Sequence, residues 1–405
     1  MTNTLVQISI ITAIYNKSQY LDDYVESIKS QSFKNFEVIC VEDCSTDDSM
    51  EHLQELVLDD SRFVIVQNEV NSGLSVSRNK AIKMSKGKYI CFLDADDCFR
   101  PNALEILWKS AEKFKLEGIF FGASEYSEDL KRELRTIQYK KQYPVCDGKS
   151  LMALLHERNE YQSACGFQLW NKEFIRQMEV DFFPGIVYED TLFTLQTLLR
   201  AKRVMVISDV LYIYRKCNNS ISHSLGIEQL YSCVVIYDEL SKIANEYLDD
   251  YQAYPEILDR IQLFSRRIEH IVCTVQEDSL PKFYNSRYNM ILQTFLKDYK
   301  YPYLRTLSID EINKLKRSKQ VFIFGDGVIA EETLVFLKRQ DVKIKGIIVS
   351  YLEQQKRWHD YRMIAVDDFY EDGIVVISVT EKWRDAIESI LHMRGNETIY
   401  ITQNG

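Results

Sequence analysis

The sequence contains no apolar run long enough to cross a membrane. No segment of its 405 residues approaches the run of about 18 apolar residues that marks a membrane-spanning helix. The first residues, Met1 to Gln7, lack the basic start and the long apolar stretch of a secretory signal. We therefore expect a protein that stays inside the cell, in the cytoplasm.

Two further absences narrow the function: paired cysteines and an excess of basic residues. The nine cysteines form no CxxC pair and no spacing typical of a zinc site, so we expect reduced thiols packed in or near the core. The formal net charge is -10. Because nucleic-acid binding depends on neutralising phosphates, nucleic acid is not expected as a partner.

The first hundred residues alternate between strand and helix signals. Short apolar runs predict four strands, and apolar positions at helical spacing predict the helices between them, at about 18–31, 49–58 and 75–84. This order predicts a mostly parallel sheet with helices on both faces, and ligands bind such sheets beyond the carboxyl ends of the strands. The predicted strands are Ile8–Ile14, Phe36–Val41, Phe63–Gln67 and Tyr89–Leu93.

The length of the chain predicts more than one domain. We expect an α/β domain over 1–225, a mainly helical linker or acceptor-side region over 226–314, and a small α/β domain over 315–405. In the last part, the strand Val321–Phe324 leads into a turn that resembles a shortened dinucleotide-binding turn, Gly-x-Gly-x-x-Ala. No clear acidic residue follows the second strand there. We therefore expect a degenerate Rossmann-like module for acceptor docking or oligomerisation.

The strongest single feature is an acidic cluster that follows the strand Tyr89–Leu93. Asp94, Asp96 and Asp97 lie within four positions, and Asp94 and Asp96 can share one face of an extended segment. Crowded carboxylates repel unless a cation lies among them, and Mg²⁺ or Mn²⁺ takes oxygen ligands and bridges to phosphates. An acidic turn can also merely begin a helix. The apolar strand before it favours a functional site.

Three weaker motifs surround this cluster. Strand two ends in Glu42-Asp43, where a carboxylate can accept hydrogen bonds from a base or a ribose, or a nearby side chain can cap a helix. Residues 71–79 form a turn entering a helix that carries Arg78, which suits an anionic ligand or an exposed helix face. Glu189-Asp190 is either a helix cap or the source of a base for an attacking hydroxyl.

Taken together, these motifs resemble the family 2 glycosyltransferases of the GT-A fold. The resemblance rests on residues 8–16, 41–47, 71–79, 92–97 and 189–190, whose order and spacing match the family across about residues 5–220. Each motif alone is weak, but five in sequence are specific. Ala13 stands where the family usually has proline, a small departure because that position contacts the nucleotide mainly through its backbone.

The resemblance implies a donor site for a nucleotide sugar, most simply a UDP-sugar. Asp43 would read the uracil or another base, with Ala13 and Tyr15 lining that pocket. Arg78 would lie near the base or the phosphates, and Asp94 would contact the ribose or the donor sugar.

The same resemblance implies the metal and the chemistry. Asp96 would bind Mn²⁺ or Mg²⁺, and Asp190 would deprotonate the acceptor hydroxyl for an in-line attack that inverts the anomeric centre, with Glu189 orienting the acceptor. Arg215 belongs to a segment that resembles the mobile loop closing over the diphosphate. His223 in that segment is either a metal ligand or a surface histidine.

The acceptor side is implied by Trp170 and Lys172, whose segment is similar to one in bacterial members of the family. We expect transfer to a hydroxyl of a glycan, lipid-linked or protein-linked acceptor in bacterial surface polysaccharide or glycoprotein synthesis. A lipid-linked acceptor would bring the protein to the inner face of the membrane. The alternatives are a nucleotidyltransferase, whose basic glycine-rich loop is missing, and a non-catalytic sugar-nucleotide-binding module, which the acidic residues disfavour.

Overall fold

A computed structural model of the chain shows two compact units, residues 1–224 with 231–264 and residues 225–230 with 265–405. The predicted boundaries at 225 and 314 stay a prediction, and residues 231–264 of the expected middle region group with the first unit. The structure describes residues 5–127, 131–216, 226–274, 288–292, 309–325, 330, 333–334, 337–338, 341–350, 357–358, 361–378 and 381–400.

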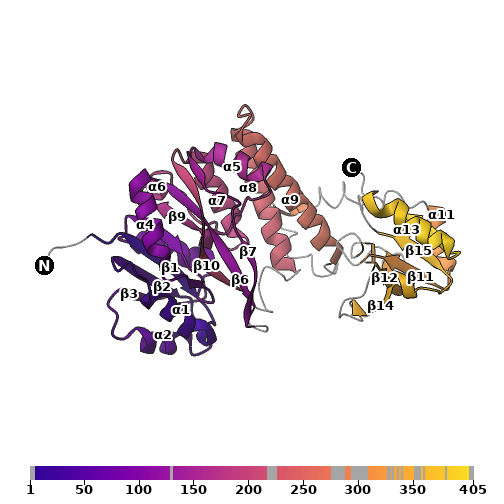
Figure 1. The fold of residues 1–405 in the computed structure, drawn as a ribbon, viewed down its shortest axis with the longest axis horizontal. Coiled ribbons are helices and arrows are strands. Elements are labelled where there is room, and N and C mark those ends of the chain that lie inside the picture. The colour runs from indigo at the N-terminus through magenta and orange to yellow at the C-terminus, as the bar shows by residue number, and fades with distance from the viewer. Residues whose placement is uncertain are drawn as a thin grey trace. The chain divides into compact units, whose positions relative to one another are not determined.

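The first unit is built on a ten-stranded sheet (Figure 1). Its strands are β1 (Ile8–Ile14), β2 (Phe36–Glu42), β3 (Phe63–Gln67), β4 (Tyr89–Phe92), β5 (Cys98–Phe99), β6 (Gly118–Ser127), β7 (Arg132–Ile137), β8 (Tyr143–Cys146), β9 (Gln168–Asn171) and β10 (Val204–Lys216). Their order is β3-β2-β1-β4-β9-β6-β10-β5, with β7 beside β6 and β8 beside β10. The pairs among β1 to β4 are parallel, as predicted, whereas β9 runs antiparallel to both β4 and β6.

Helices connect these strands and extend beyond them. They are α1 (Leu21–Lys29), α2 (Ser49–Val57), α3 (Leu74–Met84), α4 (Ala103–Phe114), α5 (Gly148–Glu157), α6 (Lys172–Gln177), α7 (Glu189–Arg200), α8 (Ile227–Glu246) and α9 (Ala253–Thr274). The helices predicted at about 18–31, 49–58 and 75–84 are confirmed, as is the helical character after residue 227. Within the part of the chain that the structure describes, no helix is long and apolar enough to span a membrane.

Side chains that alternate along the strands pack the two faces of this sheet against different helices. On β4, Cys91 belongs to a core that also contains apolar residues of α1, α2 and α4. The next residue, Phe92, points to the other face, where its ring lies 5.2 Å from that of Phe182 and 5.6 Å from that of Phe193 on α7. This packing brings α7 against the strand that precedes the acidic cluster.

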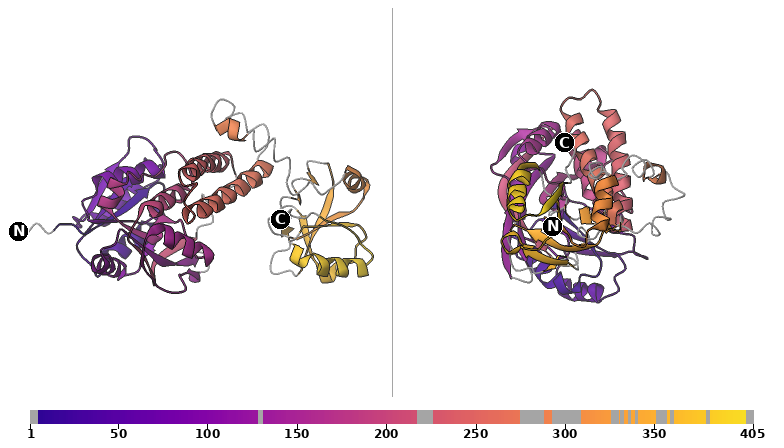
Figure 2. Two further views of the ribbon diagram at one scale, coloured as in Figure 1. Left: turned by 90° about the horizontal axis from the view of Figure 1, so that it is seen from above. Right: turned by 90° about the vertical axis from the view of Figure 1, so that its right-hand side faces the viewer.

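The second unit contains a separate six-stranded sheet flanked by helices (Figure 2). All neighbouring strands are parallel except β13, which confirms the small Rossmann-like α/β module. Apolar clusters cover both faces, one including Leu315 of α11 and the other Leu391 of α13. The elements are α11 (Ile309–Arg317), β11 (Val321–Phe324), β12 (Ile344–Val349), β13 (Arg357–Trp358), β14 (Tyr361–Ala365), β15 (Ile374–Ile377), α13 (Glu381–Met393) and β16 (Glu397–Tyr400), in the order β13-β14-β12-β11-β15-β16.

The glycine-rich turn of this unit is described only at its first residue. Gly325 has a φ of 120°, which favours glycine, and its N–H donates to the carbonyl of Ile348 on the neighbouring strand at 2.8 Å. The remainder of the predicted turn, residues 326–329, lies outside the described residues. The strands β14 and β16 were missing from the sequence prediction, because neither is a purely apolar run.

Candidate active site

The predicted donor motifs meet at one edge of the main sheet. Asp43 follows β2 and Asp94 follows shortly after β4, and both strands run parallel to β1 between them. The carboxyl ends of parallel strands in such a sheet form a common edge at which ligands bind. The structure therefore brings together side chains that are far apart in the sequence.

Asp43 is almost completely buried and holds the loop that enters α3. Its Oδ1 accepts hydrogen bonds from Asn68 Nδ2 at 2.7 Å and from the Ser72 N–H at 2.8 Å, and its Oδ2 accepts from the Gly73 N–H at 2.8 Å. Gly73 has a φ of 86° at the start of this helix, a conformation that favours glycine. Asp43 thus fixes the turn at residues 71–73, and its predicted role in reading the base stays a prediction.

Ala13 and Tyr15, which were predicted to line the base pocket, lie at the end of β1. Ala13 is partly buried in the strand, and Tyr15 is exposed. Asn16 has a φ of 53°, and its Oδ1 accepts from the Thr46 N–H at 2.8 Å, which ties this turn to the loop after β2. Tyr15 is therefore an exposed side chain next to a turn that Asn16 ties to the loop after β2.

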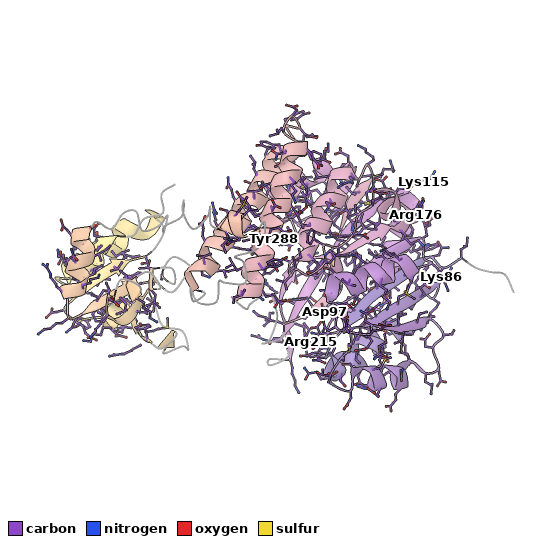
Figure 3. The ribbon with its side chains drawn as sticks, turned by 180° about the vertical axis from the view of Figure 1, so that it is seen from behind. Lys86, Asp97, Lys115, Arg176, Arg215 and Tyr288 are labelled. Carbon is purple, nitrogen blue, oxygen red and sulfur yellow. The ribbon has the colours of Figure 1, made fainter. Side chains whose placement is uncertain are left out.

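Asp97 is a buried anchor for the segment that carries Arg215 (Figure 3). Its Oδ2 accepts from the Tyr212 hydroxyl at 2.6 Å, and its Oδ1 accepts from the Arg215 N–H at 2.7 Å. Burial, followed by the charges of Asp96 and Asp94, raises the pKa of the Asp97 carboxyl well above its usual range. Asp97 thus supports the segment that carries Arg215, and Tyr212 is a partner that sequence analysis missed.

The Arg215 guanidinium lies directly behind the acidic cluster. Its Nε donates to the Asp96 carbonyl at 2.9 Å, and its Nη2 pairs with Asp23 Oδ2 at 2.6 Å. The guanidinium carbon also lies 5.4 Å from the centre of the Tyr20 ring. Arg215 is thus held close to Asp96, and its predicted contact with a diphosphate stays a prediction.

Asp94 and Asp96 offer the oxygen atoms that a hard divalent cation requires. The Asp96 carboxylate pairs with the ammonium of Lys17, so a cation already lies against this oxygen in the structure. The Asp94 side chain is 43% exposed and therefore accessible to a ligand. Carboxylate oxygens at the end of a strand fit Mn²⁺ or Mg²⁺, whose ligands in proteins are mainly oxygens. Sequence analysis did not find Lys17, although it directly follows the first motif.

Arg78 joins the acidic cluster to the beginning of α7. Its Nη2 pairs with Asp94 Oδ1 at 2.7 Å and its Nη1 with Glu189 Oε1 at 2.6 Å, while the Arg78 side chain is only 4% exposed. The guanidinium carbon lies 5.2 Å from the centre of the Phe182 ring. In this structure Arg78 therefore positions two carboxylates, and its predicted contact with the donor stays a prediction.

Asp190 lies next to this bridge in the first turn of α7. Burial and then the neighbouring Glu189 carboxylate raise the pKa of Asp190 to about 7, against the opposing charge of Arg78. A base with a pKa near the working pH is both deprotonated and basic enough to accept a proton. Burial raises the pKa of the Cys165 thiol well above its usual range. The charges of Arg78, Asp94, Asp190 and Glu189 also act on it, so the thiol borders the same group of charges. Its sequence context gave no sign of this location.

The predicted acceptor-side residues make contacts inside the fold. Trp170 is fully buried, stacks on Phe174 and donates from Nε1 to Gln168 Oε1 at 2.9 Å, so its side chain presents no surface to an acceptor here. Lys172 Nζ donates to the Ser85 carbonyl at 2.6 Å. The acceptor role of this segment stays a prediction. His223, the second metal candidate, lies outside the described residues.

Comparison with known proteins identifies the family. Residues 9–175 match the family model described as glycosyl transferase family 2. Residues 9–175 therefore form a family 2 glycosyltransferase domain. Among curated relatives, the glycosyltransferase TuaG of Bacillus subtilis is 43% identical over 105 residues, or 26% of this chain and 42% of TuaG. Glycosyltransferase GlyA of Streptococcus pneumoniae is 30% identical over 223 residues, or 53% of this chain and 31% of GlyA. The chain thus spans less than half the length of both relatives.

The solved structures confirm the GT-A fold. The structure of S. aureus TarS 1-349 in complex with UDP-GlcNAc aligns over 83% of this chain and 88% of the TarS chain, with a TM-score of 0.53. The sequence identity is 20%, so the likeness concerns the fold.

Proposed function

We propose that the chain is an inverting glycosyltransferase that transfers a hexosyl or N-acetylhexosaminyl group from a nucleotide sugar, a UDP-sugar, to an acceptor hydroxyl. The observation that carries this proposal is the half-buried Asp190, with a pKa raised to about 7, one residue from a carboxylate that Arg78 connects to Asp94. This arrangement supports Asp190 as the catalytic base beside the predicted donor site. The UDP-GlcNAc named in the TarS structure supports the same donor class.

On the donor side, the uracil or other nucleobase of the sugar nucleotide would occupy the strand-end pocket formed by Ala13, Tyr15 and Asp43. The exposed Tyr15 ring would offer a stacking surface, and Asp43 fixes the turn at residues 71–73. Arg215 would place its positive charge near the diphosphate that leaves in the reaction. The Asp97 carboxylate holds the Arg215 backbone, and the backbone carbonyl of Asp96 accepts from the Arg215 guanidinium. The positive charge of Arg215 is therefore positioned before a donor binds.

Asp96, together with the accessible Asp94, would hold a Mn²⁺ or Mg²⁺ ion. When bound, such an ion neutralises charge that develops on the departing diphosphate. The ammonium of Lys17 now occupies part of this place and would have to release Asp96.

In the transfer step, a bond forms between the acceptor oxygen and the anomeric carbon while the bond from that carbon to the diphosphate oxygen breaks. The proton of the acceptor hydroxyl passes to the Asp190 carboxylate. Arg78 holds Glu189 on one side and Asp94 on the other, so it fixes the start of α7 relative to the donor edge. Holding the two substrates in reacting geometry supplies much of the rate acceleration.

The acceptor and the cellular setting are further parts of the proposal. We infer a glycan, lipid-linked or protein-linked acceptor in bacterial surface polysaccharide or glycoprotein synthesis, approaching from the side of β9 and Lys172. The protein would act in the cytoplasm, with peripheral contact at the inner face of the membrane when its acceptor is a lipid. The Rossmann-like module would dock the acceptor or join copies of the chain. The names of the relatives support the enzymatic class alone.

Release of UDP in the presence of Mn²⁺, measured over a panel of UDP-sugars, tests this function. We expect one sugar nucleotide to raise the melting temperature, because a ligand that binds the folded state stabilises it. Asp190→Asn should abolish transfer while this thermal shift is retained. Asp310→Asn is the matched control, since Asp310 also lies in the first turn of a helix but in the second unit. Wild-type turnover in Asp190→Asn would refute the assignment of the base.

A further inference from the structure

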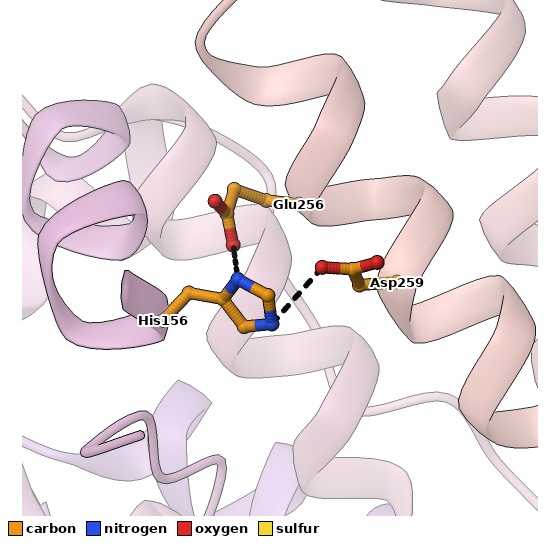
Figure 4. Close-up of side chains that lie close together, drawn as sticks. All are labelled: His156, Glu256 and Asp259. Carbon is orange, nitrogen blue, oxygen red and sulfur yellow. Dashed lines mark ion pairs between the residues drawn. The ribbon is translucent and has the colours of Figure 1, made fainter. Parts of the chain in front are cut away.

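A second group of potential metal ligands lies on the first unit, apart from the acidic cluster (Figure 4). It consists of His156 in the last turn of α5 and of Glu256 and Asp259 on α9. Glu256 and Asp259 are three residues apart, so both project from the same face of the helix. The group therefore joins two helices that are separated by about a hundred residues of sequence.

The two carboxylates approach opposite nitrogens of one imidazole ring. His156 Nδ1 lies 3.2 Å from Glu256 Oε2, and His156 Nε2 lies 3.0 Å from Asp259 Oδ2. One ligand atom from each residue lies within 4.8 Å of the other two. An ion bound at about 2.1 Å to two ligands in tetrahedral geometry holds them about 3.4 Å apart. The spacing of His156 Nδ1 and Glu256 Oε2 is close to that value.

Glu256 is the residue whose surroundings most strongly indicate a bound ligand. It is 8% exposed, and its Oε2 is buried without a hydrogen-bond partner although it points at the His156 ring. A buried carboxylate oxygen without a donor is costly to keep. Glu256 is therefore a buried carboxylate with one oxygen that lacks a hydrogen-bond donor.

We propose that His156, Glu256 and Asp259 bind a divalent transition-metal ion, with Zn²⁺ as the best match. An imidazole with two carboxylates is a ligand set that suits Zn²⁺, with water in the remaining position. One ion can bind only one nitrogen of the ring, so the ion lies between His156 Nδ1 and Glu256 Oε2. Asp259 then turns from Nε2 toward the ion, which its 41% exposed side chain permits.

This ion has a structural role that is independent of the proposed transfer reaction. It ties the first turns of α9 to α5, and α5 packs against α7, the helix that begins with Glu189 and Asp190. A cross-link at this position stabilises the helical layer behind the predicted base. The group shares no residue with the Asp94 to Asp97 cluster, so the two metal sites can be tested separately.

The test uses the full chain with Asp96→Asn as the background, so that the catalytic metal site is removed. After dialysis against a chelator, Zn²⁺ is added, and bound zinc is counted by elemental analysis and titrated by calorimetry. We expect one Zn²⁺ per chain and a higher melting temperature. Co²⁺ in place of Zn²⁺ should give the visible absorption of a four-coordinate site.

Ligand variants and a matched control decide the outcome. His156→Ala and Asp259→Asn should each weaken Zn²⁺ binding by at least about tenfold and remove the Co²⁺ absorption. His52→Ala is the control, since His52 Nε2 lies 3.2 Å from Asp22 Oδ2, a histidine–carboxylate contact that belongs to no three-ligand group among the described residues. Asp259→Asn alters a partly exposed side chain and serves as the second test if His156→Ala does not fold. Unchanged zinc binding in folded Asp259→Asn would overturn the proposal. So would a melting temperature that changes with pH but not with added Zn²⁺, because the three residues would then form only an ion pair.

Discussion

The raised pKa of Asp190 predicts a pH profile that an ordinary aspartate does not give. The pKa of this carboxyl is raised from 3.8 to about 7, first by burial and then by the charge of Glu189. The base must be ionised to accept a proton, so kcat/KM should fall as the pH drops through about 7. A single group with that pKa is about one-tenth ionised at pH 6, which predicts a loss of about tenfold relative to the plateau.

Changing Glu189 to glutamine tests the cause of this shift. Glu189→Gln removes a negative charge that raises the pKa of Asp190 and leaves Arg78, which lowers it. The acid limb of the profile should therefore move to lower pH. The plateau rate should also fall, because a neutral amide holds the Arg78 guanidinium less firmly than a carboxylate does.

The assay is UDP release at saturating Mn²⁺, with kcat/KM measured from pH 5.5 to 8.5 in wild type, Glu189→Gln and the control Asp310→Asn. The pH dependence of folding stability gives a second test of the raised pKa of Asp190. Because the folded-state pKa of Asp190 is raised, the stabilisation by its proton is lost as the pH rises from 3.8 toward about 7. Asp190→Asn should therefore melt no lower than wild type at pH 8. A flat profile, or a limb that does not move in Glu189→Gln, would contradict the reasoning.

Three further predictions concern the support of the site. Tyr212→Phe removes the hydroxyl that donates to the buried Asp97 at 2.6 Å. We expect the free energy of unfolding to fall by about 1–3 kcal/mol in a denaturant titration. No change would mean that water replaces the hydroxyl. Gly118→Ala would place a Cβ 2.5 Å from the Trp170 ring. Calorimetry should show that the free energy of unfolding falls by about 1–3 kcal/mol through overpacking. An unchanged melting temperature would show that the ring can move. Removal of divalent ions should stop UDP release, with recovery on adding Mn²⁺ in wild type but not in Asp96→Asn; full activity in chelator would refute the metal role.

The sequence alone determined where the first four strands lie along the chain and which residues follow each strand. Runs such as Ile8–Ile14 and Phe63–Gln67 are apolar, rich in β-branched residues and bounded by turns, and both were found with their boundaries. Because strands joined through helices run parallel, their carboxyl ends must meet at one edge, and the order of the strands is therefore enough to place Asp43 and Asp94 in one site. The five motifs in order also sufficed for the family.

Only the tertiary structure decided which side chains contact each other at that edge. Arg78 and Glu189 are 111 residues apart, and Tyr212 and Asp97 are 115 residues apart. Their contacts depend on how β9, β6 and β10 continue the sheet beyond β4, and on α7 packing against Phe92. Local periodicity carries no information on such pairs, because it reports which face is buried and leaves the partner on that face undefined.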